Sequence, residues 1–193
     1  FLLGGTNMST TNELLYYIPA GQYGKEGVLA LLEQHPEIKF VSLVGIDLAG
    51  NDTDEKIPMS AFFDDYESFF EGRAVQTDGS SVVLTNIATL NNARVDMWGD
   101  PSVNWFVDYN YENIDPVTGL PTGTLRIPAF LMHNYRYVDS RSILKRSCDY
   151  VRAELLALIK EHGLPGMPHV KADEVVDIIF TSATELECWV KTP

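Results

Sequence analysis

Residues 38–56, IKFVSLVGIDLAGNDTDEK, decide the fold class of this chain. The run from Ile38 to Asp47 is almost continuously apolar, which is typical of a strand near the centre of a sheet. The Gly, Asn and Asp residues of 48–56 predict a turn, with the acidic run 51–55 in solvent. The segment KIPMSAF leaves this turn, so the stretch predicts a hairpin. A calcium loop would need more oxygen ligands than these residues supply.

The segments around the hairpin mix helical and strand patterns. Residues 25–37 carry apolar side chains at helical spacing and stop near Pro36. Residues 60–71 predict a Phe-rich helix that lies in the core or at a subunit interface and ends at Gly72. Runs rich in β-branched and aromatic residues then predict strands at 81–90, 93–98, 103–111 and 124–134, with a loop at 112–123. The fold class expected from this order is α+β.

From Asp139 onward the pattern changes. A helix is expected over residues 140–162, capped by Asp139 or Ser140 and ended by Gly163. A last strand is expected from about Val175 to Val190. The predicted domains are therefore an N-terminal extension (1–24), a first domain (25–138) and the start of a second, truncated domain (139–193).

Composition limits the classes of partner. The 193 residues carry a formal net charge of -13, which argues against nucleic acid or an anionic membrane as the main partner. No apolar run is long enough to span a bilayer. Cys148 and Cys188 have no metal-ligand spacing, so both are expected to be reduced and buried in a cytoplasmic protein. The four histidines are expected to be surface or locally bonded residues.

Two short acidic motifs admit a structural and a functional interpretation. The sequence TDGSS, with Asp78 to Ser81, predicts a hairpin turn from its residue types alone. Glu185 and Glu187 point to the same side of a strand, because side chains alternate along strands. This pair is either a solvated strand end or part of a divalent-metal site whose other ligands lie elsewhere.

These pieces, in this order, resemble the N-terminal part of the glutamine synthetase family. Asp47 and Gly50 fit the family's D-x-x-G turn, and Pro58 fits the proline after it. The strongest match is DGSS at 78–81, and VDMWGDPS at 95–102 fits a D-M…P-D-x-S segment. DSRSILKRS at 139–147 looks like the first helix of the family's catalytic domain, and ELE at 185–187 looks like its E-x-E motif.

The resemblance implies a β-grasp domain followed by the first helix and strand of a catalytic domain. It implies an ATP-dependent ligase that converts glutamate and ammonia into glutamine through a γ-glutamyl phosphate. Asp78 would bind ammonium, Asp96 would support catalysis, and Ser80 and Ser81 would contact substrate. Glu185 and Glu187 would hold Mg2+ or Mn2+ in two or more sites completed by residues beyond this chain. A ring-shaped homo-oligomer with active sites shared between subunits is also implied.

The sequence departs from the family pattern in three places. Thr77 replaces an apolar residue, the segment 81–96 is longer than usual, and 105–138 contains an aromatic-rich insertion. These departures suggest a divergent branch of the family. Two alternatives also stay open: a self-contained β-grasp module that binds another protein, and a ligase that joins glutamate to another amine. The chain alone, as a fragment, is expected to be inactive.

Overall fold

A computed structural model describes residues 13–78, 81–82, 94–183, 185 and 187. Contacts divide the chain into two compact units, Phe1–Ser142 and Ile143–Pro193. Each unit is described below by itself.

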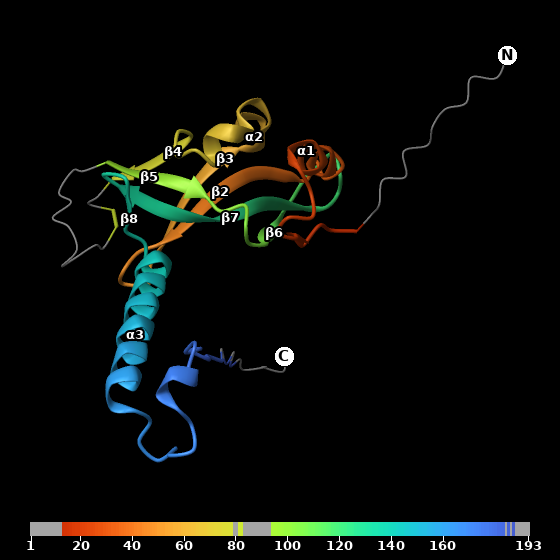
Figure 1. The fold of residues 1–193 in the computed structure, drawn as a ribbon. Coiled ribbons are helices and arrows are strands. Elements are labelled where there is room, and N and C mark those ends of the chain that lie inside the picture. Colours follow the sequence, from red (N-terminus) through yellow and green to blue (C-terminus); the bar gives the residue numbers. More distant parts are fainter. Residues whose placement is uncertain (1–12, 79–80, 83–93, 184, 186, 188–193) are drawn as a thin grey trace. The chain divides into compact units, whose positions relative to one another are not determined.

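The first unit is built on a mixed sheet (Figure 1). Its main path runs β1-β6-β7-β2-β3, while β5 and β8 also pair with β7, and β4 pairs with β5. Strands β2 and β7 are parallel and every other pairing is antiparallel. The strands are β1 (Tyr17–Ile18), β2 (Ile38–Ile46), β3 (Asp52–Pro58), β4 (Val75–Asp78), β5 (Arg94–Gly99), β6 (Trp105–Ile114), β7 (Pro121–His133) and β8 (Arg136–Tyr137).

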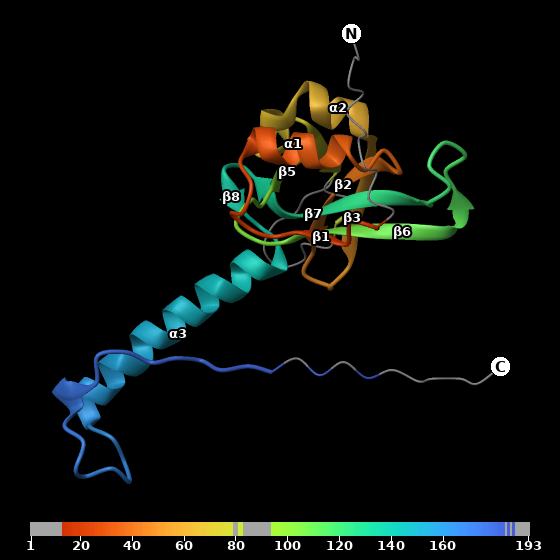
Figure 2. The ribbon, with the colours of Figure 1, turned by 90° about the vertical axis from the view of Figure 1, so that its right-hand side faces the viewer.

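Helices of the first unit cover one face of this sheet, as both ribbon views show (Figures 1 and 2). They are α1 (Lys25–Glu33), α2 (Met59–Asp64) and the short 3-10 helix η1 (Tyr66–Phe69). The α+β class is thereby confirmed, and the β-grasp assignment stays a prediction. Helix α1 agrees with the expected helix before Pro36.

The single helix expected over residues 60–71 is wrong, because the structure breaks it at Asp65. This residue has φ −140° and ψ 59°, outside the helical region, and its carboxylate accepts a hydrogen bond from the Ser68 hydroxyl. The side chain thus offers the backbone an alternative to a continuous helix. Gly72 ends the segment with φ 67°, as expected for a C-terminal glycine.

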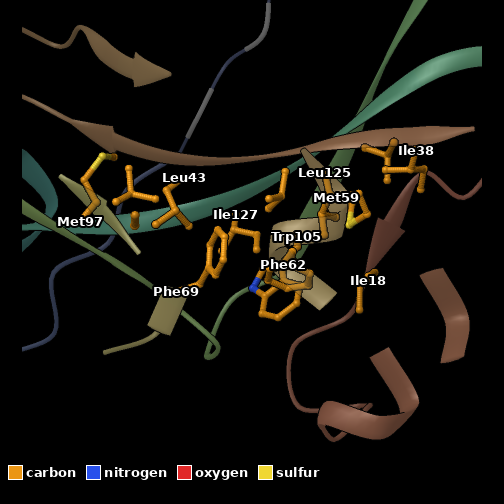
Figure 3. Packing of buried hydrophobic residues seen from close by; sticks show 14 of the residues in the cluster. Ile18, Ile38, Leu43, Met59, Phe62, Phe69, Met97, Trp105, Leu125 and Ile127 are labelled. Carbon is orange, nitrogen blue, oxygen red and sulfur yellow. The ribbon is translucent and has the colours of Figure 1, made fainter. Parts of the chain in front are cut away.

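The core lies between the helices and the sheet. Alternate residues of the two parallel strands point into it, and Leu43 of β2 and Leu125 and Ile127 of β7 are fully buried. Figure 3 shows them facing Phe62 and Phe69. The rings of Phe62 and Phe69 meet edge to face with centroids 5.0 Å apart. The Phe-rich segment therefore serves the core of the first unit.

The hairpin 38–56 forms, with a shorter turn than expected. Strand β3 already begins at Asp52, so most of the acidic run belongs to a strand rather than to a solvated turn. Asp54 lies there within hydrogen-bonding reach of Ser42 on β2, and Asp52 pairs with Arg126 on β7. Neighbouring strands supply these partners, which residue types alone did not reveal.

Two further boundaries differ from expectation. Residues 17–18, placed in the N-terminal extension by sequence, form β1 and pair with β6, and Ile18 is buried. The loop expected over residues 112–123 shrinks to 115–120, because β6 extends to Ile114 and β7 begins at Pro121. The strand expected at 81–90 lies mostly outside the described residues.

The second unit contains most of α3 (Ser140–His162) and the 3-10 helix η2 (Ala172–Glu174). Asp139 caps α3 by accepting a hydrogen bond from the Ser142 amide at 2.8 Å, and Gly163 follows with φ 74°. Both ends of this helix agree with the sequence prediction. Cys148 is half-buried rather than buried, and it is a free thiol.

The strand expected from Val175 to Val190 is not formed in the described part of that range. An extended segment becomes a strand only when another strand satisfies its N–H and C=O groups. Within the described residues of the second unit there is no such partner strand. Residues 175–183 thus have the apolar pattern of a strand but no partner strand among the described residues of the second unit.

Candidate functional site

Strand pairing gathers several polar residues on one face of β4, β5 and β7. Asp78 lies opposite Arg94, Gln76 lies opposite Asp96, and Asp96 lies opposite Met132 on β7. Side chains alternate along β5, so Arg94, Asp96 and Trp98 point away from the core that takes Val95 and Met97. Asp78 and Asp96, predicted as catalytic from sequence, therefore lie on the same face as diagonal neighbours across two strands.

Asp78 ends β4 and begins a turn. Its carbonyl oxygen accepts a hydrogen bond from the Ser81 amide at 2.9 Å, which is the contact of a four-residue turn. The hairpin-turn interpretation of TDGSS is thereby supported. Asp78 and Ser81 are both exposed, and Ser80 lies outside the described residues.

The Arg94 side chain contacts polar residues on both β5 and β4. Its Nε donates to Asp96 Oδ1 at 2.5 Å. With its amide oxygen turned toward Arg94, Gln76 accepts from Nη2 and Nε at 3.0 and 3.2 Å. The Asp96 side chain is 28% exposed and that of Arg94 is 61% exposed, so the ion pair is partly solvated. Such pairs contribute about 1 kcal/mol or less and exchange partners readily.

A pocket of about 320 Å³ opens beside this ion pair. Its wall on β5 consists of Arg94, Asp96 and Trp98. The opposite side is the end of β7 with the turn into β8, and it is formed by Met132, His133, Asn134 and Tyr135. The pocket thus combines a carboxylate, a guanidinium, an imidazole, an amide, a thioether, an indole and a phenol.

The turn between β7 and β8 has unusual backbone geometry. Asn134 and Tyr135 both have positive φ, 48° and 60°, as a two-residue hairpin turn of this kind requires. His133 supports the turn: its Nδ1 donates to the Arg94 carbonyl at 3.0 Å, and its Nε2 accepts from Asn134 Nδ2 at 2.8 Å. These partners assign the ring proton to Nδ1. The expectation of a locally bonded histidine is confirmed at His133.

Another group of ionisable residues is closed to solvent. His35 Nδ1 lies 2.9 Å from Glu37 Oε1, and the Tyr109 hydroxyl donates to the Leu15 carbonyl at 3.0 Å. Burial, and then the nearby Glu37 carboxylate, raise the pKa of Tyr109. All three side chains are buried, so this cluster holds α1, β2 and β6 together rather than forming an open site.

Glu185 and Glu187 lie in an irregular part of the second unit, and both are exposed. The described residues contain no group of three or more His, Cys, Asp or Glu that could hold a metal ion. Two carboxylates supply a minority of the six or more oxygens that Mg2+ or Mn2+ binds. The described residues therefore fit such a metal only in part.

Sequence reasoning missed several residues of the pocket. Arg94 and Trp98 alternate with Asp96 along a predicted strand, and this period of two was the available signal. Tyr135 had no signal, because Asn-Tyr is not a usual hairpin turn and its φ is visible only in the structure.

The chain is similar in structure to a number of solved protein chains, two of which are described here. It matches a Plasmodium falciparum glutamine synthetase at 17% identity and a TM-score of 0.46, over 71% of this chain and 24% of that one. It also matches a GmaS/ADP complex at 16% identity and a TM-score of 0.40, over 64% of this chain and 25% of that one. The chain thus spans about a quarter of their length. No family model matches the sequence, and no curated protein matches it. No helix among the described residues is long and apolar enough to cross a membrane.

Proposed function

We propose that the chain is the N-terminal part of an ATP-dependent glutamate–ammonia ligase of the glutamine synthetase type. In this reaction an oxygen of the glutamate side-chain carboxylate attacks the γ-phosphorus of ATP and ADP leaves. Ammonia then attacks the carbonyl carbon of the acyl phosphate, and phosphate leaves as the amide forms. The reaction requires a group that attracts ammonium and accepts its proton.

One observation carries this proposal: Asp78 and Asp96 lie on one face, with Arg94 between them. Two carboxylates and one guanidinium give this group of three side chains a net negative charge, which attracts a cation. Asp78 is exposed and ends its strand, so a small cation has access to it. In the proposal Asp78 binds ammonium and takes its proton, Asp96 supports it, and Ser80 and Ser81 contact substrate.

Exposed apolar residues support the view that further protein packs on the second unit. Val176 and Ile179 are 87% and 81% exposed, and Leu144 and Leu158 of α3 are also exposed. Burying such side chains is favourable by about 1.5–3 kcal/mol each. Further strands that cover this surface would also pair with 175–190. In this proposal Glu185 and Glu187 would hold a divalent ion, Mg2+ or Mn2+, in part, and the further strands would bring its remaining ligands. The bound ion would offset the negative charge of the phosphates.

The open face of the first unit's sheet supports self-association. A mostly apolar depression there is lined by Val44, Ile46, Phe106 and Pro128 together with the charged Arg126, and Phe106 and Ile46 are exposed. A homo-oligomer with sites shared between subunits would cover this surface. Sedimentation of the full-length protein tests this, because a monomer at micromolar concentration would contradict it.

The reading frame beyond Pro193 is the first test of the whole proposal. A ligase requires a continuing frame that encodes further acidic metal ligands and arginines for phosphate. The product of that frame is expected to form glutamine from glutamate, ammonia and ATP, while residues 1–193 alone form none. A stop codon directly after Pro193 would favour the self-contained binding module.

The second test replaces Asp78 by Asn in the full-length protein. Asn suits the turn as well as Asp does, so folding should be unchanged. The variant loses the charge that holds ammonium, and charged hydrogen bonds are stronger than neutral ones by roughly a kcal/mol. The apparent Michaelis constant for ammonium should therefore rise about fivefold or more, while those for ATP and glutamate stay the same.

Raising the pH from 7 toward 9 should restore part of the lost rate, because it supplies free ammonia directly. The matched control is Asp108→Asn, which removes an exposed carboxylate beside another arginine, Arg126, on the same sheet. Wild-type ammonium kinetics in Asp78→Asn would show that Asp78 is a turn residue only.

A further inference from the structure

We infer that the open face of the first unit's sheet receives the β7–β8 turn of a second copy of this chain, with Tyr135 in the apolar depression and Arg136 beside Asp52. This deepens the proposed homo-oligomer, and rests on that part of the proposed function, by naming the surface of the second copy that fills the depression. The contact itself can be measured in the 193-residue chain without any ligase activity.

The depression combines an apolar floor with an acidic edge. Its volume is about 270 Å³, and an apolar cavity of roughly 150 Å³ already accepts a benzene ring. Asp52 and Asp54 of β3 lie directly opposite the two β2 residues of the lining, so their carboxylates border the depression. The lining residues are Val44, Ile46, Phe106, Arg126 and Pro128.

The acidic edge is only partly neutralised. Arg126 is shared by three carboxylates, at 2.9 Å from Asp52 and at 3.5 Å from both Asp54 and Asp108. One guanidinium therefore faces three negative charges, and the Asp52 side chain is still 56% exposed. The edge thus attracts a further cation.

The β7–β8 turn presents an aromatic ring to solvent. The hairpin turn accounts for the positive φ of Asn134 and Tyr135, but it does not require an aromatic side chain. The Tyr135 side chain is 98% exposed, so its ring contributes almost nothing to the core of its own chain. A fully exposed tyrosine at the tip of a turn is available to fill a pocket on a partner.

Arg136, the next residue, carries a charge that the first unit does not use. It is exposed and forms no ion pair with any acid in the part of the chain that the structure describes. Residues 134–146 carry four basic residues and one acid in a chain whose net charge is -13, so this segment is locally positive. The other arginines of the first unit each lie beside an acid: Arg73, Arg94, Arg126 and Arg141.

Tyr135 and Arg136 together match the chemistry of the depression. The tyrosine ring can pack on Phe106 and the aliphatic floor, and its face attracts the Arg126 guanidinium. Its hydroxyl can donate to a carboxylate at the acidic edge, and Arg136 adds the positive charge that this edge lacks. Tyrosine and arginine are also among the residues that most often dominate the binding energy of protein interfaces.

The turn that fills the depression comes from a second copy, because it cannot reach the depression of its own chain. Pro128 and His133 belong to the same extended strand, so the two surfaces stay roughly 15 Å apart along β7. Both are held in shape before they meet: paired strands form the depression, and the two hydrogen bonds of the His133 ring support the turn. Each copy carries one turn and one depression, so the contact can close into a symmetric assembly.

The test is sedimentation equilibrium of the 193-residue chain from about 10 µM to 1 mM. Reversible association is expected, with a dissociation constant of about 100 µM or lower, because a contact through one turn is at the small end of interface sizes. Raising NaCl from about 50 mM to 500 mM should weaken it, since salt screens the Arg136–Asp52 attraction.

A charge exchange between two copies identifies the contact. Arg136→Glu and Asp52→Arg should each raise the dissociation constant about tenfold or more, because each places like charges at the contact. An equimolar mixture of the two variants should restore it to within about threefold of wild type, since one pairing is then unchanged and the other is reversed. Mixing would not rescue variants that merely fail to fold.

A further variant and two controls complete the design. Tyr135→Gly keeps the turn, because glycine adopts φ 60° without strain, and should raise the dissociation constant about tenfold. Arg73→Glu and Glu55→Arg make the same two changes of charge elsewhere and should leave it unchanged. Glu55 lies opposite the core residue Leu43, so it points to the other face of β3 from Asp52.

A wild-type chain that stays monomeric, wild-type association in Tyr135→Gly or Arg136→Glu, or a mixture that fails to associate would each overturn the inference. The outcomes also distinguish it from the proposed function. Charge-exchange rescue in a protein whose full-length form makes no glutamine would overturn the ligase and keep the contact. A glutamine-forming oligomer that Arg136→Glu leaves unchanged would do the reverse.

Discussion

At the scale of single residues, buried carboxylates hold the turns of this protein. Asp47 is only 1% exposed, yet its oxygens accept hydrogen bonds from the amides of Ala49 and Asn51, both at 2.9 Å, and from Asn51 Nδ2 at 3.2 Å. Gly50 completes the turn with φ 86°, where a Cβ would be strained. The turn alone therefore accounts for both named residues of the D-x-x-G motif: Asp47 accepts hydrogen bonds from backbone amides, and Gly50 adopts a positive φ.

Replacing Asp47 by Ala should lower the free energy of unfolding by about 2 to 4 kcal/mol, because several donors lose a charged acceptor in a buried turn. Urea denaturation followed by circular dichroism measures this change. Asp52→Ala, on the same hairpin but exposed and paired with Arg126, should stay within about 0.5 kcal/mol of wild type. Equal effects of the two substitutions would refute this account of the turn.

At the scale of elements, the Asp115 side chain stabilises the turn of the β6–β7 hairpin through its hydrogen bonds. The Asp115 side chain is 3% exposed; it accepts from Lys39 Nζ at 2.8 Å, from the Val117 amide and from the Thr118 hydroxyl. The hydrogen bond from Lys39 is the main reason why the pKa of Asp115 lies below its ordinary value of 3.8. Lys39 belongs to β2, so this acid joins the hairpin to the central strand.

This pKa shift predicts how stability depends on pH. A carboxyl group whose pKa is lower in the folded state contributes stability above its unfolded pKa, and the contribution is lost as pH falls through the folded value. The Tm of wild type should therefore drop as pH falls below about 4. Lys39→Met should lower Tm at pH 7 and make the drop on acidification smaller. The control Lys56→Met should keep the wild-type profile; identical profiles for wild type and Lys39→Met would contradict the assigned role.

At the scale of the whole molecule, strand pairing and burial predict unequal stability for the two units. Strand β7 pairs with β2, β5, β6 and β8 and carries fully buried Leu125, Ile127 and Leu131. In the second unit, residues 175–183 belong to no helix or strand and expose Val176 and Ile179. Central, buried strands open only with the whole fold, whereas unpaired segments open almost freely.

Hydrogen exchange of the 193-residue chain should resolve this difference. Amides of β7 are expected to exchange slower than those of 175–183 by roughly a thousandfold or more. Mass spectrometry of peptic peptides gives both rates in one experiment. Protection of 175–183 equal to that of β7 would mean that the segment has found a strand partner within or between chains, as its apolar pattern predicts.

Periodicity and end signals in the sequence determined α1, α3, β2, β5 and most of β6 and β7. Each of these helices and strands buries one stripe or one face, which shows as a period in the sequence. Capping residues such as Asp139 and Gly163 of α3 act within a few residues, so the local sequence is enough to predict where the helix begins and ends. The turns at Asp47 and Asp78 were likewise foreseen, because an acid followed closely by glycine suits a turn on its own. The sequence also supplied Asp78 and Asp96 as candidates.

Tertiary structure alone decided which of these residues meet. The register of β4, β5 and β7 places Asp78 and Asp96 on one face with Arg94. It also builds the pocket, with Trp98 and Tyr135, from β5, the end of β7 and the turn that follows β7. It also decided that β1 exists, that the 60–71 segment breaks at Asp65, and that 175–183 stays unpaired. Each of these depends on a partner distant in sequence, because a strand requires a neighbour for its hydrogen bonds and a side chain requires a surface to pack on.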